Sequence, residues 1–224
     1  MMKIKYVKIF GERNSGTTYL YKLLENNLID VKLCNVGYDG GTGWKHGVPK
    51  MELFNEEEEF LFIFIVRELE SWLKSMYKNQ YNFKKIEKIE DFLIKKLESN
   101  DRRMLHDMNV NKEIEEQDVM SVRYSKLRSF LDFYEDVSNG IFVNMSYLQE
   151  NEKKFVEFLM REYGLGIRNK FRGVKTHTKS RKIREKNRVY DVKLPLVLIR
   201  KDEELENEVE KLKAEMKYKN GSKI

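Results

Sequence analysis

The sequence predicts an α/β fold in which a central, mainly parallel sheet lies between two layers of helices. Three observations support this prediction. Residues 6–10 form a mostly apolar run that precedes a helical pattern, and residues 60–66 form an unbroken apolar run typical of a parallel strand covered on both faces. Further strand and helix patterns then alternate along the chain. No repeat or linker divides the 224 residues, so we expect a single domain over residues 1–224.

The other elements follow in chain order from local periodicity and from helix-end signals. Residues 56–59 are four glutamates, which we interpret as a solvated turn or helix end. Gly164 is expected to end a helix as its C-cap. The predicted helices cover residues 19–24, 70–78, 84–100, 120–134, 152–163 and 203–216, and the further strands cover residues 31–36, 140–145 and 194–199.

Between the first strand and the first helix the chain reads Gly11-Glu12-Arg13-Asn14-Ser15-Gly16-Thr17-Thr18. A strand, a glycine-bounded loop and a helix N-terminus form a cradle for anions, because backbone N–H groups converge there and the helix dipole adds about half a positive charge. Thr17 replaces the lysine of the Walker A pattern G-x-x-x-x-G-K-[ST], which disfavours ordinary ATP or GTP hydrolysis. Arg13 is available as a replacement cation. The alternative interpretation is an ordinary strand–helix turn in which Ser15 caps the helix.

A second anion motif follows the apolar run 60–66. Arg67 comes directly after this run, and Ser75 lies eight residues later on a predicted helix. The carboxyl end of a central strand is where open α/β sheets bind ligands. A guanidinium suits bidentate contact with phosphate, and a hydroxyl on the next helix adds a hydrogen bond.

These two motifs together resemble the sulfotransferases that use 3′-phosphoadenosine 5′-phosphosulfate (PAPS), and the resemblance covers roughly residues 3–80. It implies a P-loop-type three-layer fold and an enzyme that moves a sulfuryl group from PAPS to an acceptor hydroxyl or amine, such as a glycan or a small metabolite. It also implies 3′-phosphoadenosine 5′-phosphate (PAP) as the product. Arg67 and Ser75 match the family's 3′-phosphate motif. The residues implied to hold the 5′-phosphosulfate are Arg13, Asn14, Ser15, Gly16, Thr17 and Thr18.

This chain departs from the family's first motif at two positions. Asn14 stands where the family has its loop lysine, so either Arg13 or Lys45 takes over that charge. Tyr19 stands where the family has a tryptophan that stacks on adenine, and a phenol ring can serve the same purpose.

The segment Lys45-His46-Gly47-Val48-Pro49 is similar to a K-x-H-x-P segment of many family members, with the spacing compressed. There the histidine is the catalytic base, which implies the same role for His46. The acceptor hydroxyl must lose its proton as it attacks, and imidazole titrates near neutrality. Lys45 would neutralise charge on the sulfonate or on the leaving oxygen. The alternative is an exposed loop histidine beside a surface lysine. His106, the competing histidine, is assigned to the surface or to a substrate loop.

Composition sets limits on the function. The chain is 36% charged with a formal net charge of +6, which favours capture of polyanions such as PAPS and PAP but does not by itself indicate nucleic-acid binding. The three His and one Cys are too few and too scattered to imply a metal site. Cys34 permits no intramolecular disulfide, no apolar run reaches the roughly 20 residues that span a bilayer, and no signal region precedes the first strand. We therefore expect a cytoplasmic protein without a membrane span.

Two basic segments leave alternatives open. Residues 168–188 carry a dense run of Lys and Arg, usual in a mobile solvated segment. On the helix predicted over 120–134, the basic side chains are expected to form a solvated face, with contact to an anionic acceptor as the alternative; they are Arg123, Lys126 and Arg128. Two rival functions remain: a P-loop kinase, and a non-enzymatic anion-binding module centred on residues 168–188. The sequence indicates neither the acceptor's identity nor the oligomeric state.

Overall fold

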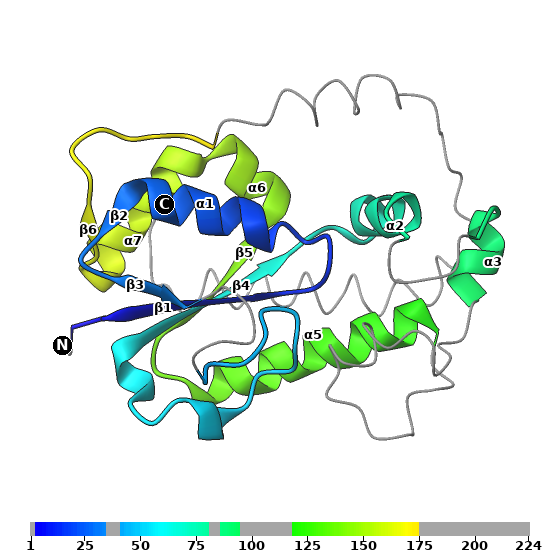
Figure 1. The fold of residues 1–224 in the computed structure, drawn as a ribbon, viewed down its shortest axis with the longest axis horizontal. Coiled ribbons are helices and arrows are strands. Elements are labelled where there is room, and N and C mark those ends of the chain that lie inside the picture. The colour runs from blue at the N-terminus through cyan, green and yellow to red at the C-terminus, as the bar shows by residue number, and fades with distance from the viewer. Residues whose placement is uncertain (1–2, 35–40, 81–85, 95–117, 175–224) are drawn as a thin grey trace.

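The computed structural model describes residues 3–34, 41–80, 86–94 and 118–174, and all statements below concern these residues. They form an α/β fold with three layers, as predicted (Figure 1). The middle layer is a four-stranded sheet in the order β3-β1-β4-β5, and every neighbouring pair in it is parallel. Its strands are β1 (Tyr6–Gly11), β3 (Lys32–Cys34), β4 (Phe60–Val66) and β5 (Gly140–Asn144).

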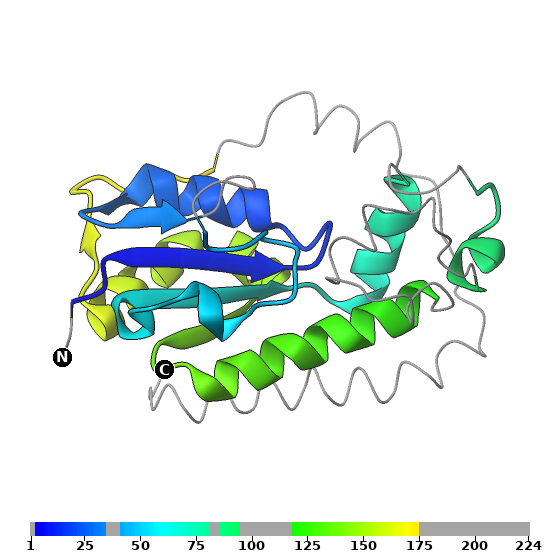
Figure 2. The same cartoon turned by 60° about the horizontal axis from the view of Figure 1, so that its bottom comes forward.

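Helices cover both faces of this sheet, with α1 on one side and α5 on the other (Figure 2). The α1 side also carries α6 and α7, and α2 follows the carboxyl end of β4. The helices are α1 (Thr17–Asn27), α2 (Leu69–Lys78), α3 (Ile89–Ile94), α5 (Val119–Asp136), α6 (Met145–Glu150) and α7 (Glu152–Tyr163), with 3₁₀ turns at Met51–Leu53 and Glu57–Glu59.

The central strand β4 is buried along its whole length. All seven of its residues are buried, and it pairs with β1 on one edge and β5 on the other. Because side chains alternate along a strand, its two faces meet different layers. Phe62 and Phe64 pack in the core on the α5 side, whereas Ile63 and Ile65 pack in the core under α1 and α7. Because both faces of β4 are buried, the sequence shows no alternation of apolar and polar residues over this strand.

Most predicted elements within the described residues are confirmed. The helix predicted over 152–163 has those bounds, and Gly164 ends it in the left-handed conformation with φ of 64°. The helix expected over 84–100 is described only as α3. A short antiparallel pair, β2 (Leu28–Ile29) with β6 (Gly166–Ile167), was missed because two residues are too few to show a period.

Several predictions fall outside the described residues. They are the strand over 194–199, the helix over 203–216, the position of His106 and the basic run beyond residue 174. The single domain over 1–224 stays a prediction. Among the described residues, no helix combines the length and the apolar character that crossing a membrane requires.

Candidate functional site

The loop between β1 and α1 requires glycine at both of its ends. A Cβ on Gly11 would lie 2.8 Å from the backbone oxygen of Ile65, a contact that real side chains do not make. Gly16 has a φ of +105°, and a Cβ there would lie 2.3 Å from the Sδ of Met145. Asn14 also has a positive φ, at 63°. The loop is therefore a tight, specific conformation pressed against the ends of β4 and β5.

The N-terminus of α1 has no side-chain cap within the described residues. The N–H groups of its first turn have no acceptor within the helix, Gly16 provides no side-chain cap, and the first turn contains no acidic residue. Ser15 does not cap the helix, so the expectation of a serine cap is wrong, while an ordinary strand–helix turn stays the alternative interpretation of the loop. Its hydroxyl is buried and donates to the backbone oxygen of Glu12 at 2.7 Å, and its own N–H donates to the same oxygen at 3.2 Å. Ser15 thus shapes the loop, while the helix end retains its positive field.

The segment that carries Lys45 and His46 lies along this loop, although about thirty residues separate them in the sequence. Gly11 donates its N–H to the backbone oxygen of Lys45 at 3.0 Å, and the backbone oxygen of Gly11 lies 2.7 Å from the Nδ1 of His46. The Nζ of Lys45 donates to the Oγ1 of Thr18 at 3.2 Å. The structure therefore brings both residues to the carboxyl end of β1.

His46 is a buried, neutral imidazole. Only 8% of its surface is exposed, so the alternative of an exposed loop histidine is wrong. Because a carbonyl oxygen can only accept, Nδ1 carries the proton toward Gly11 and Nε2 keeps the lone pair. Burial lowers the pKa of His46 to about 3, against the hydrogen bond to Gly11, and the charges of Lys45, Lys126 and Arg13 lower it further.

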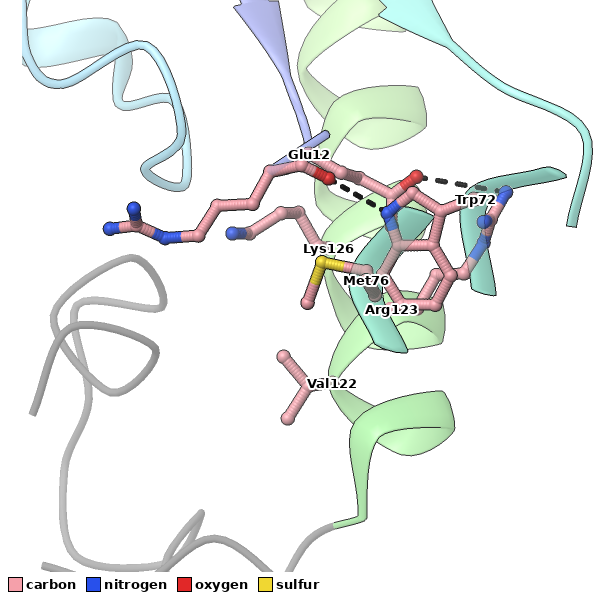
Figure 3. A pocket seen from close by; sticks show the side chains of 7 residues that line it. Glu12, Trp72, Met76, Val122, Arg123 and Lys126 are labelled. Atoms are coloured by element: carbon pink, nitrogen blue, oxygen red, sulfur yellow. Dashed lines mark hydrogen bonds and ion pairs between the residues drawn. The ribbon is translucent and has the colours of Figure 1, made fainter. Parts of the chain in front are cut away.

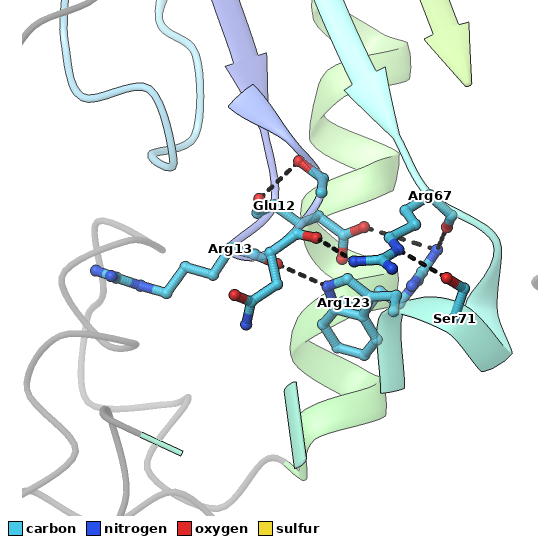
Figure 4. Close-up of polar contacts among 8 residues, drawn as sticks. Glu12, Arg13, Arg67, Ser71 and Arg123 are labelled. Carbon is cyan, nitrogen blue, oxygen red and sulfur yellow. Dashed lines mark hydrogen bonds and ion pairs between the residues drawn. The ribbon is translucent and has the colours of Figure 1, made fainter. Parts of the chain in front are cut away.

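Arg67 lies against the first loop, as its predicted role requires (Figure 4). Its Nη1 donates to the backbone oxygen of Asn14 at 3.1 Å. Its Nε donates to the hydroxyl of Ser71 at 2.8 Å, on the first turn of α2. Ser75 lies one turn later, where its hydroxyl is 3.5 Å from the Nδ2 of Asn79. The sequence predicted Ser75 as the hydroxyl that acts with Arg67, and it did not indicate the contact with Ser71. The available signal was the spacing of four residues between Arg67 and Ser71, which is one helical turn.

Arg123 of α5 joins the two motifs from beneath. Its Nη2 donates to the backbone oxygen of Arg67 at 2.8 Å and lies 3.6 Å from the Oε2 of Glu12. Its guanidinium lies 4.5 Å from the centre of the Trp72 ring, and the Nε1 of Trp72 donates to the backbone oxygen of Arg13 at 2.9 Å. The ends of β1 and β4 and helix α2 are thereby held in one network.

The expectation of a solvated basic face on α5 is wrong for two of its three residues. Arg123 is 2% exposed and Lys126 is 3% exposed. Arg128 is exposed as expected, and it pairs with Asp132 one turn later at 3.0 Å. The two buried cations face Glu12 of the first loop (Figure 3), and their side is also that of His46, which lies against the same loop.

Arg13 and Tyr19 lie on different sides of the loop. The guanidinium of Arg13 points away from Arg67 (Figure 4), and its charge is among the causes that lower the pKa of Lys45, after burial. Tyr19 is half-buried, and its hydroxyl donates to Glu152 at the start of α7. Burial and this hydrogen bond raise the pKa of Tyr19, so the phenol stays protonated.

Comparisons with protein-family models, with curated proteins and with solved structures gave no match. The part of the chain that the structure describes contains no group of three or more His, Cys, Asp or Glu side chains arranged to hold a metal ion. The site is therefore defined by its own geometry: a helix end without a side-chain cap, a lysine beside it, and an arginine against the same loop.

Proposed function

We propose that this protein is a sulfotransferase that moves a sulfuryl group from PAPS to an acceptor hydroxyl or amine by in-line displacement. The contact between Arg67 and the backbone of Asn14 is the observation that carries the proposal. It makes the cation after β4 a neighbour of the anion cradle after β1. A nucleotide with phosphate groups at both its 5′ and 3′ positions needs two such anion sites, set side by side.

The described residues divide into two groups under this proposal. The N–H groups of Thr17, Thr18 and Tyr19 would hold the 5′-phosphosulfate, with Lys45 as the cation that replaces the family's loop lysine. Lys45 suits this role better than Arg13 because its Nζ already lies at the helix end, 3.2 Å from Thr18. Arg67 would hold the 3′-phosphate with a hydroxyl from α2, and Tyr19 stays our proposed neighbour of adenine.

His46 stays the proposed base, with Nε2 as the atom that takes the acceptor's proton. A pKa of about 3 makes the imidazole a weak base in the protein alone. Burial is the main cause of this low pKa, and the charges of three cations lower it further. A bound polyanion would counter their charges, which raises the pKa of His46 and strengthens it as a base in the donor complex.

The position of Lys45 disfavours a P-loop kinase. In P-loop kinases the hydroxyl after the Walker lysine binds Mg²⁺. Thr18 occupies that position, and the ammonium of Lys45 lies 3.2 Å from its hydroxyl. A divalent cation at that oxygen would be repelled strongly at such a distance.

The test is calorimetric titration with PAP and with ATP, each with and without Mg²⁺, followed by an acceptor screen with labelled PAPS. We expect PAP to bind at least tenfold more tightly than ATP and without need of Mg²⁺. Tighter binding of ATP that disappears with EDTA would favour the kinase. Binding of neither nucleotide would refute the proposal.

A further inference from the structure

Lys8 is a buried cation on β1, an inner strand of the sheet. Its side chain is 1% exposed, its neighbours Val7 and Ile9 are fully buried, and its Nζ lies 5.1 Å from the centre of the Phe10 ring. Within the part of the chain that the structure describes, its ammonium forms no ion pair, and burial lowers its pKa to about 8. A buried ammonium without an acidic partner is costly, and a methionine of similar length would avoid that cost. A lysine at this position therefore indicates a role that needs its charge.

The ammonium of Lys8 holds the chain just before Lys45. Its Nζ donates to the backbone oxygen of Gly43 at 2.5 Å and lies 3.4 Å from the Oγ1 of Thr42. The first of these contacts is a short, charge-assisted hydrogen bond. Gly43 has a positive φ of 70°, so the chain turns at the residue whose oxygen is held. Lys8 therefore fixes the backbone two residues before Lys45.

A second attachment joins the same segment, residues 42–46, to β1. The N–H of Gly11 donates to the backbone oxygen of Lys45 at 3.0 Å, and the backbone oxygen of Gly11 accepts from the Nδ1 of His46 at 2.7 Å. Lys8 and Gly11 are separated by roughly 10 Å along the strand. The segment is therefore held on β1 near both of its ends.

We infer that Lys8 is a positioning residue, whose hold on Gly43 fixes the backbone that carries Lys45. The ammonium of Lys45 reaches the Oγ1 of Thr18 at the start of α1, at 3.2 Å. A shift of the segment would move this contact and the imidazole of His46 together, because both side chains follow one stretch of backbone. Naming these two side chains as the phosphosulfate ligand and the base rests on the proposed function. The attachment of the segment to Lys8 rests on the contacts alone.

A double-mutant cycle on PAP affinity tests whether Lys8 acts through Lys45. Calorimetric titration with PAP compares the wild type, Lys8→Met, Lys45→Met and the double variant. We expect Lys45→Met to weaken PAP binding about tenfold and Lys8→Met to weaken it about threefold. In the Lys45→Met background, the substitution of Lys8 should have no further effect on PAP affinity, because the side chain that Lys8 positions is gone.

The cycle also separates positioning from simple attraction between charges. If the charge of Lys8 attracted PAP directly, its loss would weaken PAP binding equally in both backgrounds. The matched control is Lys32→Met, which removes one exposed positive charge on the neighbouring strand β3. This variant has the same net charge as Lys8→Met, and its PAP affinity should equal that of the wild type.

A second measurement does not depend on PAP. The N–H of Gly11 donates to the backbone of Lys45, so its exchange with solvent, followed by NMR, reports how firmly the segment is held. Lys8→Met should raise the exchange rate of Gly11 about fivefold relative to that of Ile63 in β4. The free energy of unfolding in urea should not fall, because methionine removes a buried charge. Should Lys8→Met fail to fold, Lys8→Gln takes its place in both experiments.

The two proposals fail separately. Three results overturn the positioning role and leave the sulfotransferase proposal intact: Lys8→Met without effect on PAP affinity, additive effects of Lys8→Met and Lys45→Met, or unchanged exchange at Gly11. A wild type that does not bind PAP refutes the sulfotransferase proposal, and a Lys45→Met protein that binds PAP normally refutes the donor role of Lys45. In those two cases, the exchange rate of Gly11 decides whether Lys8 holds the segment.

Discussion

The guanidinium of Arg123 stacks on the indole of Trp72, 4.5 Å from the centre of the ring. The stack joins a residue of α5 to a residue of α2, and each partner also holds a loop. Arg123 donates to the backbone of Arg67, and Trp72 donates to the backbone of Arg13. The relative position of the two anion motifs thus depends on two side chains that would touch neither end of the donor.

Removing Arg123 should destabilise the protein strongly. Arg123→Met leaves Glu12 buried without its ion partner, which costs about 3–5 kcal/mol in the free energy of unfolding. Urea denaturation measures this cost. The double variant Arg123→Met/Glu12→Gln should recover part of the loss, because the carboxylate that has lost its ion partner is then replaced by a neutral amide. Arg128→Met, on the exposed face of α5, should cost no more than about 0.5 kcal/mol. Equal costs for the two methionine variants would contradict the structural role of Arg123.

Removing the guanidinium of Arg67 should weaken PAP binding. We expect Arg67→Ala to lower the affinity at least tenfold in calorimetric titration, because a charge-assisted contact to phosphate is lost. Ser75→Ala and Ser71→Ala then identify the hydroxyl that acts with it. An Arg67→Ala protein that folds and binds PAP as tightly as the wild type would remove the 3′-phosphate site.

The low pKa of His46 should appear as acid sensitivity. The folded protein binds a proton at His46 only near pH 3, whereas the unfolded chain binds it below the ordinary pKa of 6.5. Between these values the unfolded state holds more protons, so stability falls as the pH falls. From pH 7 to pH 5 this residue should account for a loss of about 2 kcal/mol. His46→Gln should lose correspondingly less stability over that range, as urea unfolding at the two pH values would show.

Lys8 should make the free energy of unfolding depend on pH in the alkaline range. Its ammonium is buried under the segment that leads to Lys45, where it donates to the backbone oxygen of Gly43, and burial lowers its pKa to about 8 from 10.5. Between these values the unfolded chain holds more protons, so stability rises with pH. The rise should be about 2 kcal/mol from pH 7.5 to 9.5 and should be absent in Lys8→Met. If the free energy of unfolding changes equally with pH in the wild type and in Lys8→Met, the lowered pKa of Lys8 is refuted.

Two glycines with positive φ should respond differently to alanine. Gly16→Ala meets both an unfavourable φ of +105° and the Sδ of Met145, so it should cost at least about 2 kcal/mol. Gly164→Ala has a φ of +64°, and no described residue lies within 4 Å of the added Cβ, so it should cost about 1 kcal/mol. Adding Met145→Ala to Gly16→Ala should relieve the contact. If Gly16→Ala is as stable as Gly164→Ala, the loop can adjust to the added Cβ and its tight conformation is not required.

The sequence was sufficient for features that depend on local pattern. The apolar run 60–66 predicted a strand covered on both faces, and Gly164 predicted the end of the helix over residues 152–163; both are confirmed. The meeting of Arg67 with the first loop also followed from pattern, because parallel strands end at one edge of a sheet.

Features that depend on distant partners could not be predicted. The spacing of Arg123 and Lys126 on α5 is that of a solvated face, and their burial is explained by Glu12, which belongs to the first loop. Ser15 has the chemistry of a helix cap, yet the positive φ at Asn14 and Gly16 turns its hydroxyl back to Glu12. Arg67 donates to Ser71 and not to Ser75 as predicted, and the spacing of four residues permits this contact without selecting it over a spacing of eight.

Because each pair in the main sheet is parallel, its strands are distant in the chain: Tyr6 pairs with Phe60, and Val66 pairs with Asn144. During synthesis, β4 leaves the ribosome long before β5 exists to cover its second edge. For that interval its apolar run is bare and suited to wrong pairing with other chains. Strand β4, which lies at the centre of the folded sheet, is therefore the segment most exposed to aggregation during synthesis.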